Sequence, residues 1–229
     1  MTPNQCGIDR PCYWELWLIT LTGLLHVTIE LMWGGSPTSA SAAGAPERLY
    51  NLVAVILWGI YVLWRIANTP GMARAWGFRW DNFFEALRPS AFFLLVAAVL
   101  LLLYGKLNDR LTVPPSFWLA LLLYPLYGIA QQFALQALVT RNLRSLISRR
   151  SIRACASAGM FSAAHFPNAW LMGLTFPTGF VFSWLYERRP NLWAVGITHG
   201  LLGALAYYLV LGLDPGAEII TAVRHIVSR

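Results

Sequence analysis

Charged residues are scarce in this sequence. Asp, Glu, Lys and Arg make up 12% of its 229 residues, about half of the roughly 25% that is usual in soluble domains. Hydrophobic residues make up 57%, and the chain carries 11 Trp, 9 Tyr and 12 Phe, rings of the kind that gather at membrane interfaces. The shortage of charge excludes a soluble enzyme, and the composition predicts a multi-pass integral membrane protein.

Cysteine is also rare. The chain has three, Cys6, Cys12 and Cys155, which are too few for a disulfide framework and match no zinc spacing. We therefore expect free thiols.

Acidic residues are outnumbered by basic ones, which gives a net charge of +7. No basic stretch is interleaved with stacking aromatic residues, so nucleic acid is not an expected partner. On a membrane protein such residues instead set orientation in anionic lipid. The expected partner is therefore membrane lipid.

Long apolar stretches predict an all-α, polytopic transmembrane helix bundle. A bilayer core needs about 20 apolar residues per helix, and seven stretches qualify or come close. The third and fifth are short, so six to eight spans remain possible. A small-residue loop, Gly34 to Pro46, follows the first stretch. We treat 1–229 as a single membrane domain with two N-terminal spans in 13–67 and a core in 76–213. The spans are Tyr13 to Trp33, Leu49 to Ala67, Ser90 to Tyr104, Phe117 to Val139, Ile152 to Phe166, Ala169 to Tyr186 and Leu192 to Leu213.

Basic residues divide unequally between alternate loops. Twelve fall on the side of the N-terminus and five on the other side. The positive-inside rule then predicts a multi-pass protein of a bacterial inner membrane with a cytoplasmic N-terminus and, for seven spans, an external C-terminus. The larger set is Arg10, Arg65, Arg74, Arg79, Arg88, Arg141, Arg144, Arg149, Arg150, Arg153, Arg188 and Arg189; the smaller is Arg48, Lys106, Arg110, Arg224 and Arg229.

An amphipathic helix is predicted from Trp76 to Leu87. Trp76, Trp80 and Phe84 recur at helical spacing, while charged residues occupy the other faces. This pattern is typical of a helix that lies flat in the interface.

Polar side chains inside the apolar spans mark the candidate site, because such groups are costly in hydrocarbon and usually face a bundle interior or a wet cavity. Gln132 and Gln136 share a helical face, with Gln131 about 100° away. Each residue alone fits ordinary interhelical hydrogen bonding; together they indicate a convergent site. The polar residues inside the apolar spans are Glu15, His26, Glu30, Gln131, Gln132, Gln136, His165 and His199.

Three of these segments resemble the motifs of the CAAX-prenyl endopeptidase and bacteriocin-processing (CPBP, or Abi) family of intramembrane proteases. Phe161 to His165 fits the family's Phe-x-x-x-His, and Asn168 fits the His-x-Pro-Asn often seen there. His199 begins its His-x-x-x-Asn motif. The resemblance implies endopeptidase activity on a lipid-modified or membrane-associated peptide, with no cofactor.

The chain departs from the family's Glu-Glu-x-x-x-Arg motif. Gln131 and Gln132 occupy the positions of the two glutamates, Gln136 that of the arginine, and Gly203 that of the final asparagine. An amide cannot accept a proton at neutral pH, so the base must come from elsewhere. The resemblance then implies that His165 is the base, with Gln131 or Gln132 holding the water and His199 acting as oxyanion donor.

Three alternatives stay open at this point. Glu30, one turn after His26, is a second candidate for the base. A non-proteolytic relative would reuse the cavity as a membrane scaffold or to bind lipid or a partner. A metal-dependent enzyme would use His26, Glu30, His165 and His199 as ligands.

Overall fold

The computed structural model describes residues 7–8, 10–33 and 45–227, and the part it describes is helical without strands. Most of the Gly34 to Pro46 loop lies outside these residues. Two π-helical segments, η3 and η4, continue the long helices α5 and α9. The elements are α1 (Tyr13–Trp33), α2 (Ala45–Asn68), α3 (Met72–Ala75), α4 (Phe83–Leu107), α5 (Ser116–Gln132), η3 (Phe133–Thr140), α6 (Arg141–Leu143), α7 (Arg150–Ala163), α8 (Ala169–Arg188), α9 (Leu192–Ala206), η4 (Tyr207–Leu211) and α10 (Pro215–Val227).

The predicted all-α membrane bundle is confirmed. Among the described residues, five helices are long and apolar enough to cross a membrane: 13–33, 46–68, 83–107, 116–143 and 192–211. The predicted third span is therefore not short, since it extends over 25 residues. The predicted fifth and sixth spans form α7 and α8, but α7 has only 14 residues and neither is among the five.

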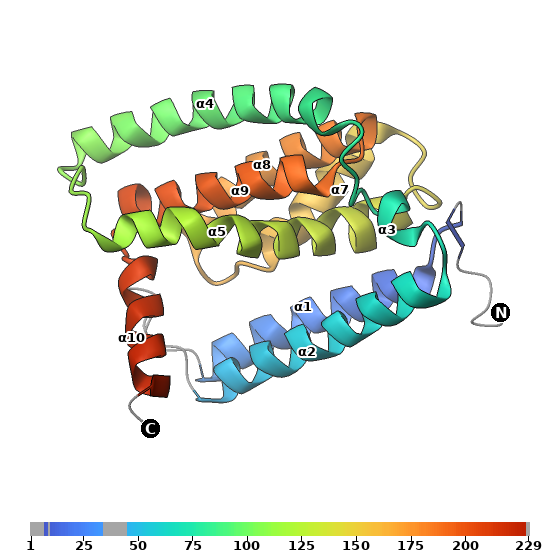
Figure 1. The fold of residues 1–229 in the computed structure, drawn as a ribbon, viewed down its shortest axis with the longest axis horizontal. Helices are drawn as coiled ribbons and strands as arrows, with labels where there is room; N and C mark the ends of the chain where they lie inside the picture. Colours follow the sequence, from blue (N-terminus) through green and yellow to red (C-terminus); the bar gives the residue numbers. More distant parts are fainter. Residues whose placement is uncertain (1–6, 9, 34–44, 228–229) are drawn as a thin grey trace.

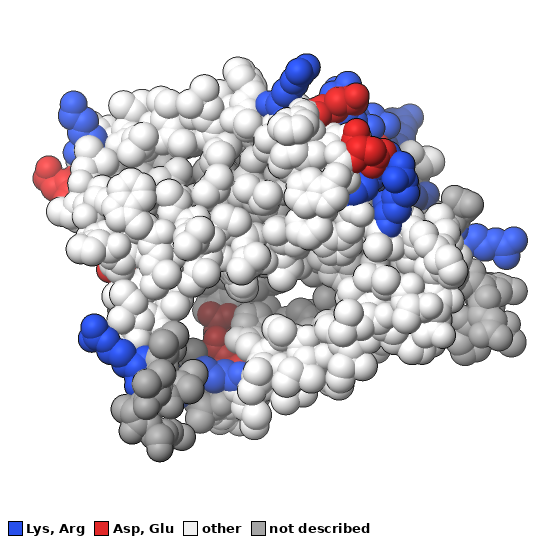
Figure 2. All heavy atoms as spheres, in the orientation of Figure 1, with Lys and Arg blue, Asp and Glu red and all other residues white. Residues whose placement is uncertain are grey.

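Helices α4, α5 and α9 run side by side, and α7 and α8 cover the far side of this layer (Figure 1). The most extensive contact joins α5 to α9. The α1–α2 hairpin lies along α5 but diverges from it toward α10 (Figure 1). Charged side chains gather at the two ends of the molecule and leave an uncharged band between them (Figure 2), as a bilayer requires.

We call one end arginine-rich and the other the opposite end. The arginine-rich end contains α3 and the termini of α2, α7 and α8, and α10 lies at the opposite end (Figure 1). The arginine-rich end carries Arg65, Arg74, Arg79, Arg141, Arg144, Arg149, Arg150, Arg153, Arg188 and Arg189.

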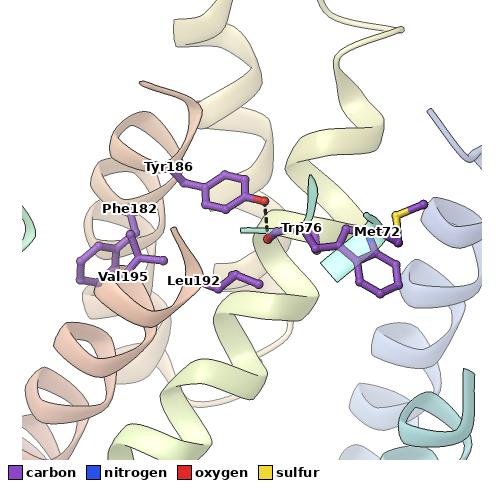
Figure 3. Close-up of a cluster of buried hydrophobic side chains, with 7 residues drawn as sticks. Met72, Trp76, Phe182, Tyr186, Leu192 and Val195 are labelled. Atoms are coloured by element: carbon purple, nitrogen blue, oxygen red, sulfur yellow. Dashed lines mark hydrogen bonds between the residues drawn. The ribbon is translucent and has the colours of Figure 1, made fainter. Parts of the chain in front are cut away.

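The helix predicted from Trp76 to Leu87 does not form in its first half. Residues 76–82 are turns and irregular backbone, and α4 begins at Phe83. Gly77 has φ +93°, a left-handed conformation that suits glycine and ends a helix. The Tyr186 hydroxyl donates to the Trp76 carbonyl over 2.8 Å, and the Leu192 amide donates to the Gly77 carbonyl, also over 2.8 Å. Trp76 is therefore fully buried in the core (Figure 3) and not interfacial.

The hairpin is tied to the bundle near the arginine-rich end. Glu15 on α1 is fully buried, accepts a hydrogen bond from Asn142 over 2.9 Å and another from Tyr61 on α2. The Cys12 amide donates to the Asn142 side chain over 2.6 Å. Arg65 lies 3.5 Å from the same carboxylate, so a buried charge is paired, as burial demands. The polar residue predicted on the first span is thus a structural link.

The expectation of free thiols is confirmed for Cys155, which is free and exposed. It is wrong for Cys12, which is disulfide-bonded.

Candidate functional site

A cavity of about 1250 Å³ lies between the α1–α2 hairpin and the bundle. The molecule is hollowed there, with acidic side chains visible inside the hollow (Figure 2). Residues from α1, α2, α4, α5, α7, α8, α9 and α10 form its wall, most of which is apolar. Seven of the predicted site residues line it, namely Gln131, His165, His199, Phe161, Asn168, His26 and Glu30.

Glycines set the position of α9 against α5. A Cβ atom at Gly128 would lie 2.5 Å from the Gly200 nitrogen, and one at Gly200 would lie 2.5 Å from the Pro125 Cα. A Cβ atom at Gly196 would lie 2.6 Å from the Ile129 Cα. Gly196 and Gly200 are four residues apart, the spacing of small residues that lets membrane helices approach closely. This contact brings the residue before Gly200 to the side chains of α5.

That residue is His199, whose Nε2 lies 2.9 Å from the Gln131 Oε1. Since Gln131 accepts through oxygen, Nε2 carries the proton and Nδ1 does not. His199 is 7% exposed, and its Nδ1 has no hydrogen-bond partner within the described chain. The hydrogen bond to Gln131 therefore fixes the orientation of the histidine and its tautomer.

His165 follows the C-terminal end of α7 and reaches the same cavity. Its Nδ1 lies 2.7 Å from the Phe161 carbonyl oxygen, which can only accept, so Nδ1 donates and Nε2 is left as an acceptor. The Phe161 ring stands edge-on to both histidines, 4.9 Å from His165 and 5.5 Å from His199 between ring centroids. Phe161 thus separates and orients the two imidazoles.

Asn168 begins α8, where its side chain accepts a hydrogen bond from the Leu171 amide over 3.0 Å. This is an N-cap, which satisfies a helix donor. Asn168 therefore fixes the turn that carries His165 while also lining the cavity.

Gln132 and Gln136 point away from the cavity. Both are fully buried, and Gln136 donates to Gln132 over 2.9 Å and to Ser183 on α8 over 3.2 Å. Thr140 donates to Ser157 on α7 over 2.9 Å. The shared face predicted for the two glutamines is real, but it faces α7 and α8. Of the three predicted amides, the structure thus brings only Gln131 to the histidines.

His26 and Glu30 lie on the hairpin wall of the cavity, with 3.8 Å between His26 Nε2 and the Glu30 carboxylate. The His26 ring stacks on Tyr50 with centroids 6.3 Å apart. The metal alternative finds no support here, because no group of three or more His, Cys, Asp or Glu side chains in the described part of the chain could hold an ion.

Sequence reasoning missed two acidic residues of the cavity, Glu47 on α2 and Glu218 on α10. Glu47 lies just before the second predicted span and Glu218 lies beyond the last one. Charged residues are common at both kinds of position. The available signal for Glu218 was the amphipathic pattern of α10. The sequence alone does not bring these two helices to one cavity.

Comparison with known proteins supports the motif argument. Residues 112–205 match the family described as type II CAAX prenyl endopeptidase, Rce1-like. No curated protein and no solved structure matches the chain. The predicted resemblance to the CAAX-prenyl endopeptidase family is confirmed over this stretch, as a divergent relative. With five apolar helices, the match supports an integral membrane protein of the CAAX-protease-like type.

Proposed function

We propose, from the match of residues 112–205 to the CAAX prenyl endopeptidases, that the protein is an intramembrane endopeptidase with a glutamine and histidine site. Its substrate is a lipid-modified or membrane-inserted peptide whose apolar part occupies the cavity. His165 is the base, His199 is the oxyanion donor, and Gln131 positions His199. Gln132, which the sequence offered as a second ligand of the water, has no part because it is buried outside the cavity.

The observation that carries this proposal is the pair of tautomers on one cavity wall. The free Nε2 of His165 takes a proton from water, and the oxygen of that water adds to the scissile carbonyl carbon. The Nε2 proton of His199 turns from Gln131 to the carbonyl oxygen as negative charge develops there. The C–N bond then breaks, and the protonated His165 gives its proton to the leaving amine. Water and amide become acid and amine.

The site's orientation follows the distribution of arginine. We propose that the arginine-rich end faces the cytoplasm of a bacterial inner membrane, by the positive-inside rule. The cavity is then lined on its hairpin side by α1 and α2, and its acidic residues lie toward the external side. The proposed partners are membrane lipid and a lipid-modified peptide.

A second candidate function, a non-proteolytic binding protein, is favoured by one observation. Gln131 is an amide where the resembled family has a carboxylate, and Gly203 offers no side-chain donor on the same wall. Such a protein would bind the apolar ligand without cleaving it.

The test of activity uses purified protein in lipid nanodiscs and farnesylated or acylated peptides with mass-spectrometric detection of products. We expect His165→Ala to lose about 100-fold or more in rate, because positioned acid–base groups typically contribute about 10²–10⁴-fold. Asn51→Ala is the control, since Asn51 is a polar residue of the same cavity on α2 with no assigned role. Equal cleavage by His165→Ala and the wild type would exclude His165 as the base.

The variant Gln131→Glu separates the two candidates. If the wild type binds the peptides without cleaving them and Gln131→Glu gains cleavage, the binding function is correct. If the wild type cleaves and Gln131→Glu changes only its pH profile, the endopeptidase function is correct.

A further inference from the structure

We propose that the cavity selects an apolar peptide that carries a positively charged residue, and that Glu30, Glu47 and Glu218 bind this charge. The inference rests on the proposed function only for the peptide nature of the ligand. It specifies the substrate class, which neither the histidines nor the family match defines.

The three carboxylates come from distant parts of the chain. Glu30 lies near the C-terminal end of α1, Glu47 in the first turn of α2 and Glu218 in the first turn of α10. All three line the one cavity, and none of the described lining residues is Lys or Arg. The chain has a net charge of +7, so the cavity has the opposite charge balance to the molecule that contains it.

Among the described lining residues, the basic side chain beside this group is that of His26. Glu30 has His26 at 3.8 Å, and Glu47 adds a repulsive charge near Glu30. Burial and the neighbouring Asp214 raise the pKa of Glu218, the opposite of what a nearby cation would do. Glu30 and Glu47, which repel each other, are both stabilised when a cation enters between them.

Two further features of the same cavity indicate a ligand. His199 lines the cavity and is more than nine-tenths buried, and its Nδ1 is a buried acceptor without a hydrogen-bond partner in the described structure. The Tyr124 and Tyr207 rings lie 5.7 Å apart, and Glu218 is close enough to act electrostatically on both. Aromatic rings beside carboxylates are the usual surroundings of a bound ammonium group.

The remaining wall favours an apolar body for the ligand. Leu24 and Val27 on α1, Leu100 on α4 and Leu174 on α8 line the cavity. A ligand that fills the cavity therefore places an apolar chain among these residues and its positive charge at the carboxylates. A lipid-anchored peptide with a lysine or arginine beside the anchor fits both.

The experiment compares two fluorescent peptides with the same lipid anchor, one carrying a lysine next to the anchor and the other a glutamine. Binding is measured with His165→Ala protein in nanodiscs, so that cleavage is not needed. We expect the lysine peptide to bind about tenfold more tightly at low salt, with the preference falling as salt rises. Equal affinities would overturn the proposal.

Protein variants locate the effect. Glu47→Gln and Glu218→Gln are each expected to reduce the lysine preference, and Glu85→Gln is the matched control. Glu85 pairs with Arg189 at the arginine-rich end, where its side chain is 66% exposed. A preference that survives both cavity variants, or is lost equally in the control, would also overturn the proposal.

Competition distinguishes the ligand's source. If phosphatidylcholine nanodiscs abolish the lysine preference and phosphatidylglycerol nanodiscs do not, the carboxylates bind a lipid ammonium group and the peptide proposal is wrong. The proposed function fails separately, since charge-dependent binding without cleavage by the wild type refutes the endopeptidase and leaves this inference standing.

Discussion

At the scale of single residues, the chain uses three neighbouring glutamines for two different purposes. Gln131 holds His199 on the cavity wall, whereas Gln132 and Gln136 form a buried hydrogen bond against α8. Adjacent residues on a helix differ by about 100°, so one turn of α5 serves both the cavity and the core. The amides are thus not interchangeable, although the sequence presents them as one motif.

The buried pair makes a prediction about stability. Gln136→Leu removes the donor to Gln132 and leaves the Gln132 oxygen buried without a partner, which costs about 1–3 kcal/mol. The double variant Gln132→Leu with Gln136→Leu removes both polar groups and is expected to be nearly as stable as the wild type. Thermal unfolding in detergent measures both. A double variant less stable than Gln136→Leu alone would contradict this account.

At the scale of elements, the α5–α9 crossing determines where His199 lies. Gly128, Gly196 and Gly200 allow backbone to pack on backbone, and every displacement of α9 moves His199 relative to Gln131. The crossing leaves no room for a side chain at these positions, so a residue larger than glycine causes a steric clash.

Gly200→Ala is therefore expected to destabilise the protein by about 1–3 kcal/mol, as overpacking does, and to reduce substrate cleavage or binding. Gly173→Ala on α8 is the control, because a Cβ atom there meets nothing within 4 Å; it is expected to be neutral or to add up to about 1 kcal/mol from helix propensity. Unfolding temperatures and ligand assays report both. Similar behaviour of the two variants would refute the importance of the crossing.

Helix α10 is held to α5 by Asp214. Its carboxylate accepts hydrogen bonds from Ser116 and Tyr208, each over 2.6 Å, and from the Ala217 amide over 2.9 Å. Burial alone would raise the pKa of Asp214, but the hydrogen bonds outweigh burial and the pKa lies below its ordinary value of 3.8. A lowered folded-state pKa means that the stabilisation is complete above the ordinary value and is lost as the pH falls through the folded value.

We therefore expect α10 to stay docked at neutral pH and to detach under stronger acid. Spin labels on Ala217→Cys and Lys106→Cys, both at the opposite end, measure the separation across this range. Asp214→Asn is expected to loosen α10 at neutral pH, because an amide nitrogen then faces a hydroxyl donor. Asp109→Asn in the nearby turn is the control. A label distance that ignores both pH and Asp214→Asn would disprove the anchor.

At the scale of the whole molecule, charge is confined to the two ends (Figure 2), and the proposed orientation can be measured directly. In a chain whose native cysteines are replaced by serine, Lys106→Cys should react with a membrane-impermeant maleimide in intact bacterial cells. Arg189→Cys should react only after lysis. The reverse pattern would place the arginine-rich end outside, against the positive-inside rule.

Much of the fold could be predicted because helices in lipid must be long and apolar. The predicted bounds of α1 agree with the structure, and those of α8 differ only by two residues at one end. The predictions fail where contacts with residues distant in the sequence determine the local structure. Tyr186 and Leu192 bind the backbone at Trp76 and Gly77, which no local pattern reveals. The helical spacing therefore predicts an interfacial tryptophan where the structure has a buried one.

The sequence predicts the kind of residue that forms the candidate site but not the full set of residues that line it. Polar residues in apolar spans pointed to Gln131, His165 and His199, which line one cavity. Helical spacing also grouped Gln132 with Gln136, but spacing does not say which neighbour a face meets. The sequence does not predict Glu47 and Glu218 as site residues, because only tertiary folding brings α2 and α10 to the same cavity.

The attachment of the α1–α2 hairpin has a consequence for how the protein opens. Links at Cys12, Glu15 and Asn142 hold the hairpin near one end, while Glu30 and Glu47, near the other end, border the cavity. Local opening free energies follow such contacts, so amide exchange should be slow near Glu15 and progressively faster toward Glu30. The α1–α2 hairpin is then expected to bend away from the bundle at the end that carries Glu30 and Glu47. This bending, and not the volume of the cavity in the structure, limits the size of the ligand that can enter.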